Sequence, residues 1–361
     1  MKKIFIEIGH PAHVHLFKNI YWELEKRGWQ GLFITKDKDC AINLLKSYKL
    51  PFKILGKTQD KIVNKILTLP YFALKMYKLA KIYKPDLFVS RGSPISGWSS
   101  FLLRKPHITL SDTENVKLYD SIAKPFIDVI LTSSSYKRNH GGKQIRYPGY
   151  HELAYLHPKY FTPNPSVLEE EGIDMNEKYA IVRFVSWTAH HDIGHQGFSE
   201  ANKLKLVKEL SRYLKVFISS EGDLPEELKK YQIKIKPENM HNVLYYAQLF
   251  IGESATMASE CAVLGTPSIY LNDSQLGYII SEADYGLVHM FNEDEISQLK
   301  ALNKSIEIIS QPDIKNEYRE RAQKMLQDKI DVTSFLVWFI ENYPESVKEV
   351  KSPEFSFDRF K

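Results

Sequence analysis

Three histidines fall within seven residues in GHPAHVH, residues 9–15, directly after the apolar run KIFIEI. Imidazoles this close together can bind a metal, transfer a proton or contact a polar ligand. The segment contains no carboxylate or cysteine at a metal-ligand spacing, so a metal site is not favoured. We expect His13 to act in catalysis or to contact an acceptor, and Gly9 and His10 to bind the substrate or nucleotide, with shaping of the turn as the other role for His10.

The strongest chemical signal is IGESATMASECAVLGTP, residues 251–267. It predicts a strand, a loop of small residues, and a helix that begins near Met257 and ends at Gly265. Small side chains let a phosphate approach the N–H groups at a helix N-terminus, where the helix dipole favours negative charge. Glu260, one turn further on, is placed to bind a ribose, and an ordinary capped turn with Glu260 in an ion pair is the alternative. The loop residues expected at the phosphates are Gly252, Ser254, Ala255 and Thr256, and Glu253 between them is a further candidate for binding the nucleotide or substrate.

Two carboxylates follow a predicted strand in ITLSDTEN, residues 108–115. Asp112 and Glu114 are two residues apart, so both lie on one side of an extended segment, where either could serve as a general base. Helix capping is the alternative role for this segment. The neighbouring SRGSPISG adds Ser93 as a ligand candidate and Arg91, whose guanidinium can bind a carboxylate or phosphate with two hydrogen bonds.

A third polar segment, RFVSWTAHHDIGHQGF at residues 183–198, follows the predicted strand YAIVRFV. Its histidines and aspartate could suit a metal, but it has no HExxH frame, so contacts with a nucleotide sugar or an acceptor are favoured. An ordinary surface loop is the remaining interpretation. The ligand candidates here are Arg183, Trp187, His190, His191 and Asp192.

Strand-like runs alternate with helix-like segments along the whole chain, which predicts an α/β fold of parallel sheets with helices on both faces. The expected strands are KIFIEI, GLFITK, FKIL, DLFVS, HITLS and DVILTS, then YAIVRFV, LKVFISS, KIKP, LFIGES, PSIYLN and LVHMF. They indicate two doubly wound, Rossmann-like domains facing a cleft, at residues 1–160 and 161–335. Residues 336–361 are expected to form a C-terminal helix and a flexible or peripheral tail that pack toward the first domain.

Composition narrows the class of protein. The 361 residues carry a net charge of +5 and two distant cysteines, Cys40 and Cys261, so neither a disulfide framework nor a thiolate metal site is indicated. We find no signal peptide or membrane-spanning run, expect a cytoplasmic protein, and expect no nucleic-acid partner. Residues 53–84 mix lysines with apolar side chains, a pattern that suits peripheral contact with the inner face of a membrane or a solvated helix face.

The order strand, GxSxTxxxE, helix, GTP, strand resembles the nucleotide-diphosphate site of GT-B fold proteins. Within that group the order resembles especially the MurG-like glycosyltransferases and the non-hydrolysing UDP-N-acetylglucosamine 2-epimerases. The signatures HPAHVH, SDTE and WTAHHDIG are also similar to those of a prokaryotic family of predicted glycosyltransferases. The resemblance implies that Ser254, Ala255 and Thr256 hold the diphosphate and that Glu260 binds the ribose. It also implies that the loop containing Asn272 touches the donor sugar, although turn formation would equally explain that residue.

The resemblance further implies a glycosyltransferase that moves a sugar from a nucleotide-diphosphate donor, a UDP-sugar, to a cell-surface polysaccharide or lipid-linked acceptor. No metal or other cofactor is expected, and the base would be His13, or else Asp112 or Glu114. A UDP-sugar 2-epimerase is the first alternative, but the chain has Gly-His-Pro-Ala-His where that family has Gly-Thr-Arg-Pro-Glu. A protein that binds a nucleotide sugar without turnover is the second.

Overall fold

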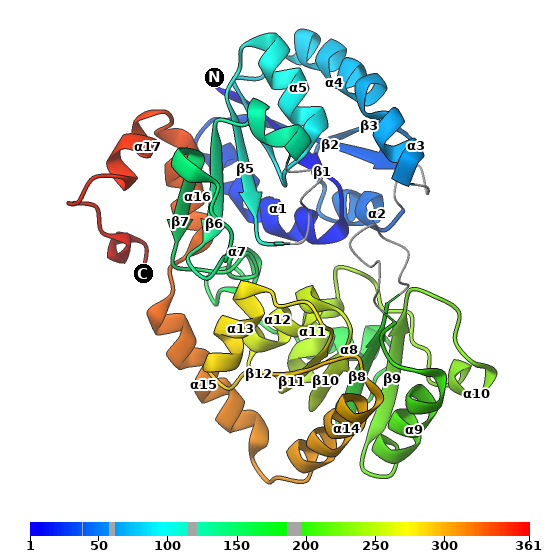
Figure 1. The fold of residues 1–361 in the computed structure, drawn as a ribbon. Helices are drawn as coiled ribbons and strands as arrows, with labels where there is room; N and C mark the ends of the chain where they lie inside the picture. The colour runs from blue at the N-terminus through cyan, green and yellow to red at the C-terminus, as the bar shows by residue number, and fades with distance from the viewer. Residues whose placement is uncertain (38, 58–61, 115–120, 186–195) are drawn as a thin grey trace. The chain divides into compact units, whose positions relative to one another are not determined.

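A computed structural model describes residues 1–37, 39–57, 62–114, 121–185 and 196–361 (Figure 1). The chain divides into two compact units, unit 1 with residues Met1–Tyr155 and Lys329–Lys361, and unit 2 with Leu156–Asp328. These boundaries lie five and seven residues before the predicted ones at 160 and 335. The second differs because α15 (Ile314–Asp328) packs on α12 (Ala255–Leu264) of unit 2, whereas α16 (Val332–Glu341) packs on α1 (Pro11–Lys26) of unit 1.

Unit 1 contains a parallel sheet of seven strands in the order β3-β2-β1-β4-β5-β6-β7. Its strands are β1 (Lys3–Ile8), β2 (Gln30–Asp37), β3 (Phe52–Lys57), β4 (Leu87–Ser90), β5 (His107–Ser111), β6 (Val129–Ser133) and β7 (Gln144–Tyr147). The apolar runs predicted all of these strands except β7, whose four residues QIRY include two polar side chains. A short edge strand buries one face only, so it lacks the continuous apolar run of a central strand.

Helices cover both faces of this sheet. The longest are α1, α4 (Leu69–Tyr83), α5 (Pro94–Leu103) and α16; the shorter ones are α2 (Asp39–Ser47), α3 (Ile62–Leu67), α7 (Leu153–Leu156) and α17 (Glu345–Val350). Helices α4 and α5 pack together on one face, while α1 covers the other with α2 and α16 beside it (Figure 1). The 3-10 turns are Lys124–Phe126, Gly141–Lys143 and Phe357–Phe360.

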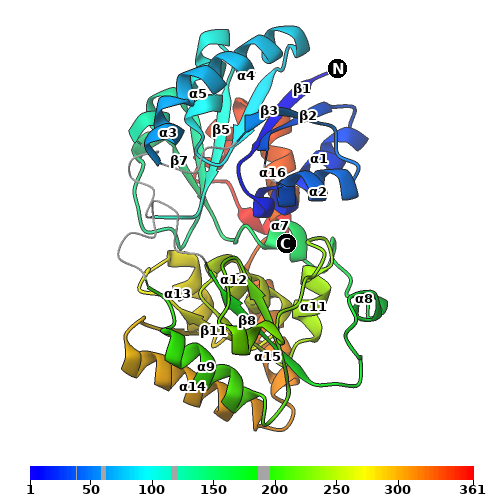
Figure 2. The ribbon, with the colours of Figure 1, turned by 90° about the vertical axis from the view of Figure 1, so that its right-hand side faces the viewer.

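Unit 2 contains a parallel sheet of five strands in the order β12-β11-β10-β8-β9, which Figure 1 labels in turn; β8 and β11 are also labelled in Figure 2. Its strands are β8 (Tyr179–Phe184), β9 (Lys215–Ser220), β10 (Leu249–Gly252), β11 (Ser268–Leu271) and β12 (Val288–Phe291). Besides α12 and α15, its helices are α8 (Ser166–Glu170), α9 (Glu200–Leu210), α10 (Glu226–Lys229), α11 (Met240–Tyr246), α13 (Gly277–Asp284) and α14 (Glu295–Ile309). Each strand runs parallel to its neighbours, so the loops after the strands all emerge at one edge.

One prediction about local structure was wrong. KIKP, residues 234–237, forms no strand; the chain there makes only an isolated bridge between Ile218 and Gln232. A proline at its end removes a backbone donor, and two of its side chains are lysines with no core to enter. The tail packs on unit 1, because Phe360 is buried and lies against Phe335 and Trp338 of α16.

Within the described part of the chain, no helix is both long enough and apolar enough to cross a membrane.

Candidate functional site

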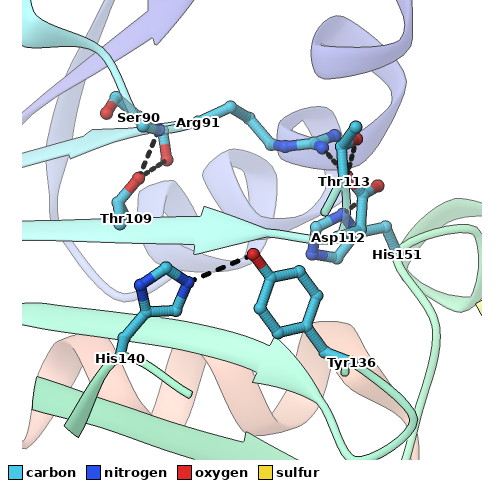
Figure 3. A network of polar contacts seen from close by, with 9 residues as sticks. Ser90, Arg91, Thr109, Asp112, Thr113, Tyr136, His140 and His151 are labelled. Atoms are coloured by element: carbon cyan, nitrogen blue, oxygen red, sulfur yellow. Dashed lines mark hydrogen bonds and ion pairs between the residues drawn. The ribbon is translucent and has the colours of Figure 1, made fainter. Parts of the chain in front are cut away.

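The polar side chains of unit 1 meet after the carboxyl ends of its strands. Arg91 follows β4, Asp112 follows β5 and His151 lies four residues after β7. Parallel strands place such loops at one edge of the sheet, and Figure 3 shows the three side chains converging there. These three residues are the centre of the candidate site.

Asp112 is bonded on both carboxylate oxygens. Its Oδ1 pairs with an Nη atom of Arg91 and accepts a hydrogen bond from Thr113 Oγ1 at 2.8 Å. Its Oδ2 lies 2.9 Å from His151 Nδ1 (Figure 3). The turn that carries Arg91 is fixed by Thr109. Its Oγ1 donates to the Ser90 carbonyl at 3.0 Å and accepts a hydrogen bond from the Gly92 N–H. Hydrogen bonds among residues that follow β4, β5 and β7 therefore hold the site together.

The pair Asp112–His151 has a defined protonation state. Burial alone would raise the pKa of Asp112, but Arg91 and His151 hold it far below its usual range, so the carboxylate is ionised. Burial lowers the pKa of His151, so its ring is neutral. An ionised carboxylate only accepts hydrogen bonds, so the His151 proton lies on Nδ1 and Nε2 carries a lone pair. His151 therefore offers a base already oriented by a carboxylate.

Three buried polar atoms of this cluster have no hydrogen-bond partner among the described residues: Arg91 Nε, Tyr147 Oη and His151 Nε2. Tyr147 is fully buried, and burial followed by the charge of Asp112 raises the pKa of its hydroxyl. Buried polar groups are rarely left unpaired, so such atoms mark where a ligand or a water bonds. These unbonded atoms are typical of a binding site, whereas the polar atoms of a purely structural network bond one another.

The structure does not arrange His13 as the general base that the sequence predicted. The Gly9 N–H donates to His13 Nδ1 at 3.1 Å, so a neutral His13 carries its proton on Nε2. Burial, then the charge of Arg91, lowers the pKa of His13 well below its ordinary value, which keeps the ring neutral. In this state Nε2 donates, and it has no lone pair with which to accept a proton. His10 accepts the Ala12 N–H at 3.2 Å and caps α1, as the turn role predicted for it requires.

His151 was not among the predicted site residues. It lies in GYHELAYL, close to the predicted domain boundary at residue 160, and there is no histidine pattern around it. The C-terminal segment supports this turn: the Ile330 N–H donates to the Pro148 carbonyl at 3.0 Å, and a Cβ on Gly149 would lie 2.5 Å from Val332. The signals present in the sequence were the glycine and the histidine at the end of a short strand.

Two other predicted site residues of unit 1, Ser93 and Glu114, accept hydrogen bonds from backbone N–H groups. Ser93 caps α5, with its Oγ accepting the Ile95 N–H at 3.2 Å. Glu114 does not join Asp112, because its Oε1 accepts the Lys137 N–H in the loop after β6 at 3.1 Å. That contact disfavours Glu114 as the general base.

In unit 2 the small-residue loop forms the start of α12. The helix begins at Ala255, two residues before the predicted start, because Ser254 caps it by accepting the Met257 N–H at 3.4 Å. It ends at Gly265, which adopts the predicted left-handed conformation. Ser254, Ala255 and Thr256 are partly exposed, and the first N–H groups of a helix lack partners within it. This arrangement suits an anion.

Gly252 and Glu253 serve the packing of unit 2. A Cβ on Gly252 would lie 2.6 Å from the Arg183 carbonyl oxygen, so glycine allows β10 to approach β8. Glu253 is 3% exposed, and its carboxylate accepts the Val185 N–H at 2.8 Å and the Phe198 N–H at 2.7 Å. Both oxygens are thus occupied by backbone, so the predicted ligand role of Glu253 is replaced by a structural one.

Glu253 should make stability depend on pH. Burial raises its pKa from 4.5 to about 7, so the folded state binds a proton that the unfolded state has lost between these values. The stabilisation that protonated Glu253 gives the folded state is complete below pH 4.5 and is lost as the pH rises to 7. This loss amounts to about 3 kcal/mol. Urea titrations at pH 5 and 7 should show the unfolding free energy of the wild type falling by about 2 kcal/mol more than that of Glu253→Gln. Equal decreases in the two proteins would contradict this assignment.

The remaining predicted ligands of unit 2 have partners within it. Glu260 is buried, with Oε1 2.9 Å from His241 Nε2, a residue that the sequence had not indicated. Arg183 donates to Ser219 Oγ at 2.7 Å and pairs with Glu221. Asn272 accepts the N–H two residues later, so it forms the turn that was its alternative role.

Trp187, His190, His191 and Asp192 lie outside the described residues. Among the residues that are described, no group of three or more His, Cys, Asp and Glu side chains could hold a metal ion.

Comparison with solved structures identifies proteins of the same fold. The S. aureus MnaA–UDP co-structure aligns over 99% of this chain and 100% of that chain, with a TM-score of 0.69 and 12% identity. A UDP-GlcNAc 2-epimerase from Neisseria meningitidis bound to UDP-GlcNAc covers 95% and 100%, with a TM-score of 0.65 and 11% identity. A spinosyn rhamnosyltransferase complexed with thymidine diphosphate covers 95% and 100%, with a TM-score of 0.62 and 14% identity. These likenesses confirm the predicted α/β class with two Rossmann-like units, as in GT-B proteins.

Sequence comparison finds one relative and one family. An uncharacterised protein of Methanocaldococcus jannaschii is 23% identical over 277 residues, which cover 74% of this chain and 80% of that protein. The profile of the family described as "Protein of unknown function (DUF354)" matches residues 2–331. Because this match spans most of the sequence, the chain belongs to the DUF354 family.

Proposed function

We propose that this protein is a glycosyltransferase that moves a sugar from a nucleotide-diphosphate donor, a UDP-sugar, to an acceptor hydroxyl. The observation that carries the proposal is the Asp112–His151 pair, in which the buried, neutral imidazole of His151 presents an unbonded Nε2. Deprotonation of an acceptor hydroxyl needs such a base, and the carboxylate stabilises the imidazolium that forms. In this role His151 replaces His13, which the sequence favoured.

The step is a single displacement. His151 Nε2 takes the proton of the acceptor hydroxyl as that oxygen forms its bond to the anomeric carbon. The bond from that carbon to the diphosphate oxygen breaks, and the electron pair leaves with the nucleoside diphosphate. One displacement inverts the anomeric centre. His13 Nε2–H supplies a hydrogen bond to an oxygen of the bound sugar or acceptor.

Unit 2 supplies the donor site in this proposal. The N–H groups at the start of α12, beside Ser254, Ala255 and Thr256, receive the diphosphate, and the helix dipole favours its charge. Solved structures of similar fold hold UDP, UDP-GlcNAc or thymidine diphosphate, which supports a ligand of this class. We propose that these dipoles stabilise the leaving group without a divalent cation. The acceptor we propose is a polysaccharide or a lipid-linked glycan.

A screen of nucleotide sugars by thermal shift, followed by turnover assays on the hits, tests the function. Release of a nucleoside diphosphate that depends on acceptor would support transfer. Conversion of the intact nucleotide sugar to its C2 epimer would replace the proposal with an epimerase. A thermal shift with no turnover across a panel of acceptors would favour a binding protein.

The ribose contact of Glu260 has its own test. Glu260→Gln keeps the shape of the side chain but removes its charge, and should weaken UDP affinity about tenfold, as expected for one hydrogen bond to a charged group. Isothermal titration calorimetry measures the change. Glu282→Gln is the matched control, because Glu282 is a fully buried glutamate of unit 2 that bonds Ser259. If both variants bind UDP like the wild type, Glu260 does not contact the nucleotide.

A further inference from the structure

Helix α4 of unit 1 is apolar on two opposite faces. Its inner face, including Phe72 and Met76, packs into the core with strands β1 to β4. Its outer face continues the stripe begun by the last residue of α3, with successive spacings of four, three and eight residues that put all members on one side. Leu67 is 71% exposed, Tyr71 is 55%, Leu74 is 50% and Ile82 is 82%. Single exposed apolar residues are ordinary, but an aligned row of them calls for a partner.

Helix α5 adds exposed apolar side chains next to α4. Ser96 Oγ lies 3.6 Å from Met76 Sδ, and Ser99 Oγ donates to the Ala73 carbonyl at 2.9 Å, so the two helices run antiparallel. The end of α5 is therefore beside the start of α4 (Figure 1). Two further exposed apolar side chains lie there, Phe101 at 62% and Leu102 at 60%. We call these six residues, Leu67, Tyr71, Leu74, Ile82, Phe101 and Leu102, the α4–α5 patch.

The patch is surrounded by positive charge. The sequence from 62 to 85 has no acidic residue, and Lys78, Lys81 and Lys84 are exposed along α4 or at its end. Arg104, which ends α5, is exposed as well. The acidic residue that follows, Asp86, lies 3.5 Å from Lys105 and so does not offset these cations. Apolar and basic side chains share one surface.

We infer that the α4–α5 patch docks unit 1 on an anionic lipid bilayer. Apolar side chains enter the boundary between headgroups and acyl chains, while lysines bind the anionic headgroups, as in other interfacial helices. Charge complementarity decides between lipid and a second copy of the chain. Two copies facing each other through this patch would bring like charges together, whereas an anionic surface neutralises them. The inference does not depend on the proposed function, since it concerns a different surface and needs no turnover.

Vesicle flotation of the full chain tests this docking. The protein should float with vesicles of equal parts phosphatidylcholine and phosphatidylglycerol, and bind phosphatidylcholine vesicles much more weakly. Added salt should reduce the binding because it screens the lysines. Lys78→Gln with Lys81→Gln should lower the partition coefficient about 25-fold, at about fivefold per lysine. Tyr71→Ser with Leu74→Ser should lower it by about the same factor through lost apolar burial.

The control is Ile296→Ser, which removes an exposed apolar residue of unit 2 and should float like the wild type. All variants replace exposed side chains, and matching thermal unfolding curves would show that they fold. The inference is overturned if the wild type fails to float with anionic vesicles, or if both double variants bind as well as the wild type. It is also overturned if sedimentation shows a dimer that Tyr71→Ser with Leu74→Ser abolishes, because a second copy would then cover the patch.

Discussion

Replacing His151 by asparagine should lower kcat for sugar transfer by about 10²- to 10⁴-fold, the usual contribution of a general base. Nucleotide affinity should not change, because His151 belongs to unit 1 and the proposed diphosphate site belongs to unit 2. Asparagine keeps a hydrogen-bond donor for Asp112 but places no basic nitrogen where Nε2 lies. Steady-state kinetics with saturating donor measures the effect on kcat separately from any effect on KM.

The pH profile distinguishes a base from a merely structural histidine. His151 must be unprotonated to accept a proton, so kcat/KM should fall as the pH drops below its pKa. Since burial lowers that pKa, the fall should lie below 6.5, the ordinary value for histidine. The matched control is His157→Asn, a partly exposed histidine nearby in sequence that should leave both kinetics and profile unchanged. Wild-type turnover by His151→Asn would remove the base from the proposed mechanism.

Replacing Asp112 by asparagine should destabilise the protein by about 3 to 5 kcal/mol, the usual effect of removing one partner of a buried ion pair. Arg91 and Asp112 have side chains only 15% and 13% exposed, so the guanidinium would remain without a counter-charge. The same change should reduce kcat, because an amide in place of the carboxylate no longer holds the His151 proton on Nδ1. Urea unfolding at neutral pH measures the loss of stability.

The pH dependence of this interaction has a defined direction. The pKa of Asp112 is lowered on folding, so its contribution is complete above the ordinary carboxyl range and is lost as the pH falls toward the folded value. Stability of the wild type should therefore decline on acidification more steeply than that of Asp112→Asn. The double variant Arg91→Leu with Asp112→Leu should recover much of the stability but none of the activity, because it leaves no unpaired charge. An Asp112→Asn protein as stable as the wild type at neutral pH would contradict the ion pair.

The strand pattern and the small-residue loop before α12 could be predicted from the sequence because their signals are local. A central parallel strand is buried on both faces and must be an apolar run, as KIFIEI and LFIG are. The helix stop at Gly265 was predictable because one glycine supplies the left-handed conformation. Strand β7 and KIKP were misjudged because edge pairing depends on what lies alongside.

In the candidate site, too, some features follow from local sequence and others from tertiary packing. The sequence by itself determined the α/β class, the two Rossmann-like units, and the identity of Arg91, Asp112 and the Gly9–His13 loop as polar residues at strand ends. Only the tertiary structure decided which of them meet. His151 joins Asp112 from 39 residues away, and Glu253 accepts backbone N–H groups 55 and 68 residues distant. The proton position on His13 likewise follows from one hydrogen bond to Gly9. Residue type limits which chemistry is possible, but burial and hydrogen-bond partners set the pKa and the tautomer, and these arise when distant segments pack.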